Sequence, residues 1–196
     1  MGIKLLSGLD YSTAYLELKK PVSKMEDFKG LKFRGSGDQF DVMIVALGGA
    51  PVTLTGAEVY MALQYSTVDG ASTTLDSMLT RKHYEVAPYV TDIMILPLEM
   101  FLSISLKKLL SLPKESQNIL IQCAEETQQW SRVESEKISK GLRQQLKEKG
   151  TTFVPVEPKE TKRIKQIMLQ SQLNYMRPKI GEKADKVLAV VEATRQ

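Results

Sequence analysis

Cysteine and histidine are nearly absent from this sequence, which contains one of each, Cys123 and His83. A single cysteine excludes an internal disulfide framework and leaves the redox compartment open. Cys123 falls on an apolar helical stripe, so we expect it to be buried and inert. His83 lies in a charged stretch, so we expect it to be solvated. With no metal-ligand spacing and no catalytic triad, the sequence offers no candidate chemistry for an enzyme.

Long apolar runs and runs of one charge are also missing. The longest apolar stretch, 93–106, is interrupted by Pro97 and Glu99 and falls short of the ~20 residues of a membrane span. Residues 1–6 have too short an apolar core for a signal peptide. We therefore expect either a cytoplasmic chain or a piece of a longer protein. The net charge of +4 is spread along the chain, which argues against nucleic acid as a partner.

The composition is that of an ordinary globular protein. Apolar residues make up 42% and charged residues 26% of the 196 residues, enough for one domain with a real core. Short apolar or alternating runs at 31–34, 51–54 and 68–73 predict strands, and helical spacing between them predicts two helices. This alternation favours parallel strands joined by crossover helices, and hence an α/β fold.

Two pairs of residues have the spacing of helix capping boxes, Ser36 with Gln39 and Thr55 with Glu58. Gly70 is expected to permit a tight backbone approach. The remaining predicted elements are short strands at 3–6 and 14–18, a helical turn at 25–29, a helix at 75–84, a long buried strand or pair of strands at 93–105, a closing strand at 152–156, and helices at 159–177 and 179–193 separated by Pro178.

A single long helix is predicted from Pro113 to Lys149. Proline in a first helical turn and glycine just past the end, here Gly150, are the asymmetry that helices prefer. Such a helix extends ~50 Å, which is longer than most single domains need. It is therefore expected to cross two layers or two domains, with Trp130 packed against another element.

Six segments, in this order and spacing, resemble the TRAP-type (tripartite ATP-independent periplasmic) solute-binding proteins. They are KPV at 20–22 with EDFKGLKFR at 26–34, ALGGAPV at 46–52, EVYMALQ at 58–64, VDG at 68–70, YEV at 84–86 and SLPKESQ at 111–117. Each segment is weak by itself, but together they cover nearly the whole chain.

The resemblance implies the second lobe of a two-lobed fold like that of periplasmic binding proteins, with a mixed sheet, flanking helices and one long spanning helix. Residues 12–99 and 140–196 would form this lobe. Residues 1–11 and 100–139, with most of the long helix, would belong to a first lobe that is largely missing. The implied function is periplasmic binding of a small organic acid carboxylate by lobe closure, for delivery to the membrane subunits of a transporter. No cofactor and no enzymatic activity are implied.

Arg34 is the leading candidate for a ligand-binding residue. It stands at the carboxyl end of a predicted parallel strand, where ligands bind in open α/β sheets, and its guanidinium suits a carboxylate. By resemblance, Arg34 matches the arginine that holds the substrate carboxylate in the family. Thr73 stands where the family often has an asparagine facing the ligand, and its hydroxyl could still form a hydrogen bond. A second arginine of the family has no counterpart in residues 11–15.

The rival interpretation is an α/β interaction module that has lost ligand binding, and an enzyme ranks last. The largely missing first lobe also predicts exposed apolar surface, through which two copies could form a homodimer.

Overall fold

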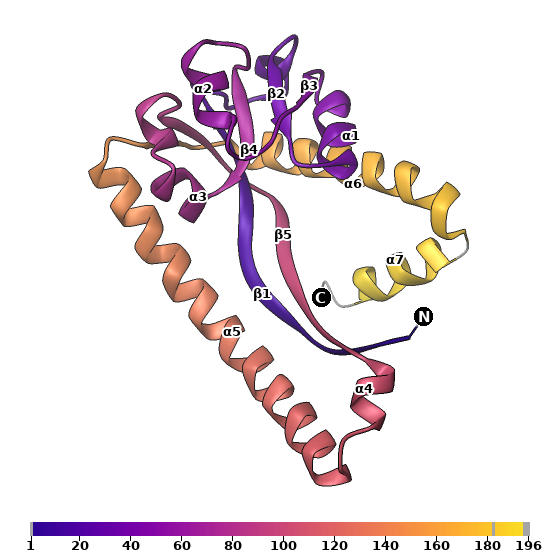
Figure 1. Cartoon of the computed structure of the whole chain (residues 1–196). Coiled ribbons are helices and arrows are strands. Elements are labelled where there is room, and N and C mark those ends of the chain that lie inside the picture. The colour runs from indigo at the N-terminus through magenta and orange to yellow at the C-terminus, as the bar shows by residue number, and fades with distance from the viewer. Residues whose placement is uncertain (1, 182, 194–196) are drawn as a thin grey trace.

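The computed structural model describes residues 2–181 and 183–193 and contains a six-stranded mixed sheet with helices on both faces (Figure 1). The strand order across the sheet is β3-β2-β4-β1-β5-β6. The strands are β1 (Ile3–Leu18), β2 (Lys32–Gly35), β3 (Ala50–Thr53), β4 (Gly70–Thr74), β5 (Tyr89–Ser105) and β6 (Thr152–Val154).

Strand β1 runs against every other strand of this sheet. It pairs antiparallel with β4 on one side and with β5 on the other, whereas β2 is parallel to β3 and β4, and β5 is parallel to β6. The predicted parallel strands within 31–73 are therefore confirmed, with their crossover helices. As a result, the carboxyl ends of β2, β3 and β4 lie along one edge of the sheet.

Two layers of helices cover the sheet, one on each face. Side chains on β1 alternate between the two faces, so this strand contributes apolar residues to the core under each layer. Leu16 and Leu18 face the core formed with α1 and α6, and Tyr15 faces the core formed with α3 and the end of α5. No helix in the described ranges is long and apolar enough to cross a membrane. The helices are α1 (Asp38–Ala46), α2 (Val59–Gln64), α3 (Leu75–Thr80), α4 (Leu106–Leu110), α5 (Lys114–Glu148), α6 (Pro158–Ile180) and α7 (Lys183–Ala193), with 3₁₀ turns η1 (Met25–Phe28) and η2 (His83–Glu85).

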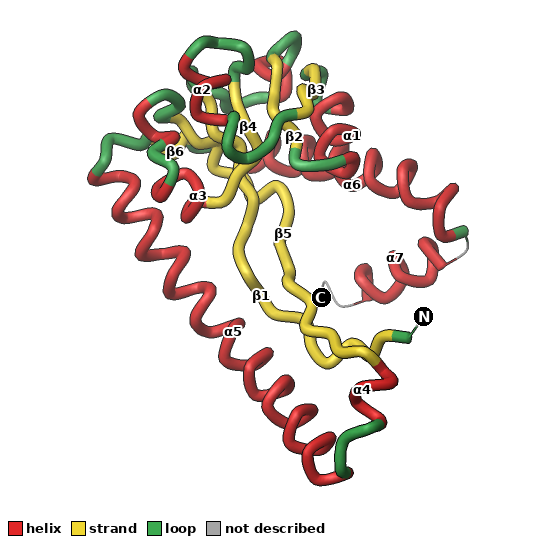
Figure 2. The backbone as a smooth tube through the Cα atoms, in the orientation of Figure 1, coloured by secondary structure: helices red, strands yellow, loops and turns green. Residues whose placement is uncertain are grey.

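Beyond the sheet, β1 and β5 continue as a two-stranded ribbon beside α5 (Figure 2). The prediction of two short strands in 3–18 was wrong, because pairing with β5 carries one strand through the whole segment. Register shifts at three points accommodate its bends. The predicted long helix is confirmed, and at 1.5 Å per residue the 35 residues of α5 extend about 52 Å.

Much of the ribbon and of α5 exposes apolar side chains. The expectation of a buried strand at 93–105 was wrong for its second half, because the ribbon has no helix packed on both faces there. Cys123 is exposed, so the prediction that it is buried was wrong. Trp130, which was predicted to pack against another element, borders a pocket shared with β1 and is 62% exposed. The exposed large apolar residues of this region include Ile3, Leu5, Met100, Phe101, Leu102, Leu106, Leu110, Ile119, Ile121, Trp130, Val133 and Ile138.

The boundary between the last two helices differs from the prediction. Pro178 does not separate two helices but lies in the last turn of α6, which ends at Gly181 with a positive φ of 57°. A proline this close to a helix end disturbs few main-chain hydrogen bonds.

Helix α1 is capped by Gly37 without a side-chain hydrogen bond, so the predicted Ser36 capping box is wrong. In the second box Glu58 does accept hydrogen bonds from Thr55, at 2.8 Å from its N–H and 2.7 Å from its hydroxyl.

The close backbone approach predicted at Gly70 is confirmed, so we expect any side chain at this position, the start of β4, to be unfavourable. A Cβ there would lie 2.6 Å from the Glu17 carbonyl oxygen and 2.9 Å from the Phe33 ring. We expect Gly70→Ala to lower the free energy of unfolding by about 1–3 kcal/mol. The matched control is Gly141→Ala in α5, where a Cβ meets no atom within 4 Å and helix propensity should add about 0.5–1 kcal/mol. Urea denaturation of both variants checks this, and an unchanged midpoint for Gly70→Ala would contradict it.

Candidate functional site

A hollow of about 260 Å³ lies where the carboxyl ends of β2 and β4 meet β1 and α3; we call it the arginine hollow. Ligands of open α/β sheets bind at this edge because the strand ends diverge there and leave main-chain and side-chain donors free. The residues that line the arginine hollow are Tyr11, Ala14, Arg34, Ser36, Phe40, Gly56, Val59, Ser72, Thr73, Thr74, Ser77, Arg81, His83 and Leu98.

Arg34 is held across the strand ends by two hydrogen bonds to main-chain carbonyls. Its Nε donates to Leu54 at 3.1 Å and its Nη1 donates to Ser72 at 3.3 Å, so the side chain connects the ends of β3 and β4. The residue is half-buried, on a strand with neighbours on both sides. The predicted position of Arg34, inside the sheet and at its carboxyl edge, is confirmed. A guanidinium has five N–H donors, so several stay available for an anion in the arginine hollow.

Ser36, Ser72 and Thr73 are among the hydroxyl-bearing residues that line the arginine hollow with Arg34. The Ser36 and Ser72 hydroxyls are 3.1 Å apart and form a hydrogen bond, which replaces the capping role predicted for Ser36. Thr73, the second residue predicted from the sequence, is half-buried on β4. The structure thus brings the two predicted residues, Arg34 and Thr73, into one hollow.

Arg81, which the sequence did not single out, supplies a second guanidinium to the arginine hollow. It follows α3 as the residue that caps its carboxyl end, and it is exposed. Burial lowers the pKa of Arg34, the charge of Arg81 lowers it further, and the charges of Glu17 and Asp41 raise it. Since no carboxylate is among the described lining residues, the hollow is suited to an anion.

A buried carboxylate and an imidazole, Glu17 and His83, lie close to Arg34, and His83 also lines the arginine hollow. His83 is 2% exposed, and its Nδ1 is 2.8 Å from Oε1 of the fully buried Glu17. The prediction of a solvated His83 was therefore wrong, because Glu17 on the central strand draws the ring into the core. Burial raises the pKa of Glu17, and the hydrogen bond and charge of His83, together with the charge of Arg34, lower it. Nε2 of His83 and Oε2 of Glu17 have no hydrogen-bond partner in the described structure.

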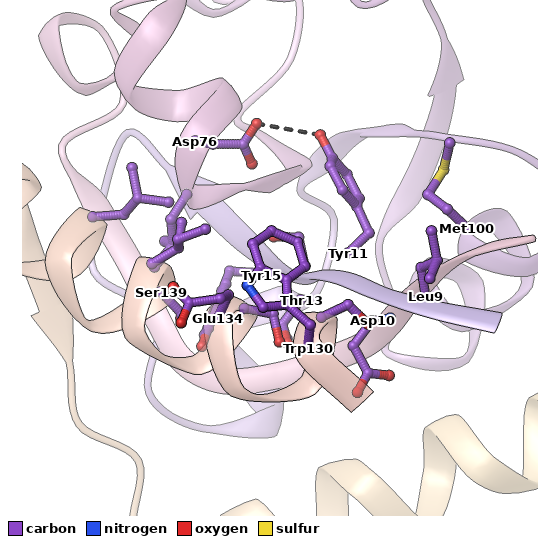
Figure 3. Close-up of a pocket in the computed structure, with 16 residues that line it drawn as sticks. Leu9, Asp10, Tyr11, Thr13, Tyr15, Asp76, Met100, Trp130, Glu134 and Ser139 are labelled. Atoms are coloured by element: carbon purple, nitrogen blue, oxygen red, sulfur yellow. Dashed lines mark hydrogen bonds between the residues drawn. The ribbon is translucent and has the colours of Figure 1, made fainter. Parts of the chain in front are cut away.

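A second and larger cavity, of about 340 Å³, opens between β1, α3 and α5; we call it the apolar pocket (Figure 3). Trp130 and Tyr15 contribute its aromatic surface, and the Tyr11 hydroxyl donates to Asp76 at 3.4 Å across one side. Asp76 raises the pKa of Tyr11, chiefly through its charge. The described lining contains no Arg, Lys or His, so the apolar pocket has no group that would fix an anion. We therefore assign the candidate ligand site to the arginine hollow.

Anion binding is the chemistry that the arginine hollow supports. Two guanidinium groups and several hydroxyls converge on it, and they act by charge-assisted hydrogen bonding without breaking a bond. Within the described ranges, no three His, Cys, Asp or Glu residues are grouped to hold a metal ion. The Glu17–His83 pair adds a buried support behind the cations.

Sequence reasoning missed Arg81, Ser72 and the Glu17–His83 pair. Glu17 and His83 are 66 residues apart, and no local pattern joins them. Arg81 stands in an Arg-Lys-His stretch that looks like ordinary solvated surface. A weak signal did exist for Ser72, since it neighbours Thr73 at the end of a predicted strand.

Comparisons with known proteins all identify solute-binding proteins as similar to this chain. Residues 1–178 match the model of Bacterial extracellular solute-binding protein, family 7. The C4-dicarboxylate-binding periplasmic protein DctP of Rhodobacter capsulatus is 34% identical over 91 residues, which are 46% of this chain and 27% of that protein.

Solved structures resemble nearly the whole chain. A TRAP periplasmic solute-binding protein of Ochrobactrum anthropi, with its C-terminus bound in the ligand-binding pocket, is 26% identical with a TM-score of 0.89, over 99% of this chain and 61% of that one. One from Rhodoferax ferrireducens with bound malonate is 25% identical with a TM-score of 0.78, over 98% of this chain and 62% of that one. The chain thus spans less than two thirds of these solved chains.

We expect the Glu17–His83 pair to be a support that tolerates joint replacement but not loss of one partner. His83→Phe leaves the Glu17 carboxyl buried without its imidazole partner, which should cost roughly 3–5 kcal/mol of unfolding free energy. The double variant Glu17→Leu with His83→Phe removes both polar groups and should recover most of that loss. Urea denaturation of the single and double variants at pH 7 measures the coupling. A double variant less stable than His83→Phe alone would count against this account.

Proposed function

Because this chain belongs to family 7 of the bacterial extracellular solute-binding proteins, we propose that its arginine hollow is one wall of a binding site for a small organic acid. The observation that carries the proposal is the placement of Arg34. Two main-chain hydrogen bonds hold its guanidinium at the carboxyl edge of the sheet, where its remaining N–H groups can donate hydrogen bonds to a carboxylate. The similar protein of Rhodoferax ferrireducens was solved with a carboxylate, malonate.

Thr73 contributes to the same wall in this proposal. Thr73 lines the arginine hollow together with Arg34, and in this proposal its hydroxyl donates one hydrogen bond to a carboxylate oxygen. The contribution is smaller than that of an amide, which has two donors. In this proposal Arg34 therefore supplies the positive charge, and the hydrogen bond from Thr73 orients the carboxylate.

The second wall would come from another lobe. We assign residues 12–99 and 140–196 to the lobe that holds the arginine hollow, and residues 1–11 and 100–139 to segments that run into the other lobe. The ribbon and α5 in these segments expose a row of apolar side chains, which is the surface expected where a lobe packs. Solved relatives are longer than this chain, which supports the assignment. Dimerisation through this surface stays a prediction.

Transport is the process in which such binding would act. The named relatives are periplasmic, and the two solved ones are TRAP solute-binding proteins, so this proposal assigns the protein to the periplasm, as a carrier that delivers its ligand to the transporter's membrane subunits. Closure of the two lobes would bury the acid, and no bond would be made or broken. The protein is thus a binding protein and not an enzyme in this proposal.

One observation favours the rival function, an interaction module that has lost ligand binding. Tyr11 and Ala14 line the arginine hollow on β1, and neither brings a cation to that side. Under this interpretation the exposed apolar ribbon would be the functional surface. Retained affinity for acids in a two-lobed version of the protein would exclude it.

We expect residues 1–196 alone to show no binding of small carboxylates by titration calorimetry at millimolar concentration. An Arg–carboxylate pair open to water contributes about 0–1 kcal/mol, because solvent screens it. A version preceded by a complete first lobe should bind at least one acid of a panel that includes malonate and malate, because closure excludes water.

Arg34→Ala in the two-lobed version should abolish that binding, since a buried carboxylate would lose its charge partner. Arg132→Ala is the matched control, because its guanidinium is exposed and pairs with Asp10 on α5's side of the ribbon. Micromolar binding by residues 1–196 alone would refute the half-site argument. An unchanged affinity in two-lobed Arg34→Ala would remove Arg34 from the site.

A further inference from the structure

Arg34 and Glu17 lie in one row across three neighbouring strands. In the register of the sheet, Arg34 of β2 and Glu17 of β1 are both partners of Ala71 on β4. Paired residues on neighbouring strands point to the same face, and two strand spacings separate the two Cα atoms by about 10 Å. The guanidinium and the carboxylate therefore start from the same face of the sheet, with the methyl group of the fully buried Ala71 between them.

Glu17 and His83 have two places that can accept a further proton. Glu17 is the only Asp or Glu among the described residues that is fully buried. Its Oε1 lies 2.8 Å from Nδ1 of His83, a contact that requires one proton between the two groups. Oε2 of Glu17 and Nε2 of His83 have no hydrogen-bond partner in the described structure. A second proton can therefore be held at either of these two atoms.

The charge of the Glu17–His83 pair depends on this second proton. With one proton the pair is net negative, and with two it is neutral, whichever atom holds the second one. Burial raises the pKa of Glu17, whereas the hydrogen bond and charge of His83 and the charge of Arg34 lower it. The negative form of the pair thus depends partly on the positive charge of Arg34.

Asp41 on α1 is the other carboxylate whose charge acts on Arg34. Burial raises its pKa, and the charge of Asp38 raises it further. Asp41 is only half-buried, so water screens its charge more than that of Glu17. Glu17 is therefore the carboxylate that responds more strongly to a change of charge at Arg34.

The other elements packed around the pair supply no free buried carboxylate among the described residues. Asp76 of α3 accepts the Tyr11 hydroxyl at 3.4 Å, and Glu85 of η2 is exposed and accepts the Tyr60 hydroxyl of α2 at 3.0 Å. The remaining charged or titratable groups nearby are the cations Arg81 and Lys82 and the phenols Tyr15 and Tyr84.

We propose that the Glu17–His83 pair takes up a proton from solvent when an anion occupies the arginine hollow, so that anion binding is tighter at lower pH. This proposal rests on the proposed function, because it takes Arg34 to hold the anion. An anion on Arg34 offsets the positive charge that supports the negative pair and adds a negative charge near it. Both effects favour the neutral pair.

The direction of the pH dependence follows from linkage. Because the anion favours proton uptake, the proton favours anion binding to the same extent. The affinity for an anion therefore rises as pH falls and declines as pH rises through the range in which the pair loses its second proton.

The test is an NMR titration of the 196-residue chain, labelled with ¹³C and ¹⁵N and prepared without a histidine tag. Sodium formate is the probe, because its carboxyl group stays ionised over the whole range and does not itself titrate. It is added up to about 100 mM at constant ionic strength, at about pH 6 and about pH 8, and amide shifts around the arginine hollow are followed. We expect formate to bind about fivefold more tightly at the lower pH, the contribution of one partly screened charge.

Two side-chain signals locate the proton. His83 is the only histidine in the sequence, so its ring nitrogens give a single set of ¹⁵N signals. At a fixed pH, formate should move either these signals or the ¹³C signal of the Glu17 carboxyl toward the protonated form.

Two variants separate the pair from other titratable groups. The double variant Glu17→Leu with His83→Phe should bind formate equally at both pH values, because every other titratable group is retained. Asp41→Asn, which removes the other carboxylate near Arg34, should keep the fivefold difference. If the double variant does not fold, the wild-type signals and Asp41→Asn still decide the question.

The outcomes distinguish this inference from the proposed function. Equal formate affinity at both pH values with neither side-chain signal responding would overturn the inference, and the proposed function would stand if Arg34→Gln weakens formate binding. If Arg34→Gln leaves formate binding unchanged, the proposed function fails with it. A pH dependence that survives in the double variant or disappears in Asp41→Asn would assign the proton to another group and overturn the inference, as would the absence of any amide shift.

Discussion

The pairing of β1 with both β4 and β5 is the constraint on which the rest of this structure depends. β1 is the one strand of the described sheet that runs against its neighbours, and it joins the parallel strands β2, β3 and β4 to β5 and β6. Its alternating side chains supply both helix-covered cores. The same strand carries Glu17 into the centre of the molecule and extends, with β5, as the ribbon beside α5.

The candidate site follows from this geometry and from uneven distribution of charge. Because β2, β3 and β4 end on the same edge, main-chain carbonyls at Leu54 and Ser72 can hold the guanidinium of Arg34 in place. Glu17 and His83 occupy the volume behind it, and Arg81 approaches from the end of α3. Positive groups therefore face the arginine hollow while the compensating carboxylate is buried beneath. Such pre-positioned donors lower the reorganisation needed when an anion enters.

The surface of the ribbon and α5 is apolar, in contrast to the positively charged arginine hollow. A helix of about 52 Å that lies beside a two-stranded ribbon cannot bury its whole apolar stripe, because few other described residues pack against the ribbon. Trp130 illustrates this: it borders the apolar pocket but remains mostly exposed. Exposed apolar area of this extent is unfavourable in water and favours association with further protein surface. The described fold thus combines a complete α/β core with an incompletely covered extension.

The sequence by itself determined the features that depend on local periodicity. The strand–helix alternation of 31–73, the long helix between Pro113 and Gly150, and the placement of Arg34 at a strand end could all be read from spacing, because backbone geometry repeats every two or 3.6 residues. Only the tertiary structure decided burial and charge pairing. His83 is buried because Glu17, far away in the sequence, lies opposite it, and Arg81 lines the same hollow as Arg34 because Gly56 leaves space for its guanidinium. Burial and electrostatics depend on which distant segments meet, and no local pattern in a single chain encodes that meeting.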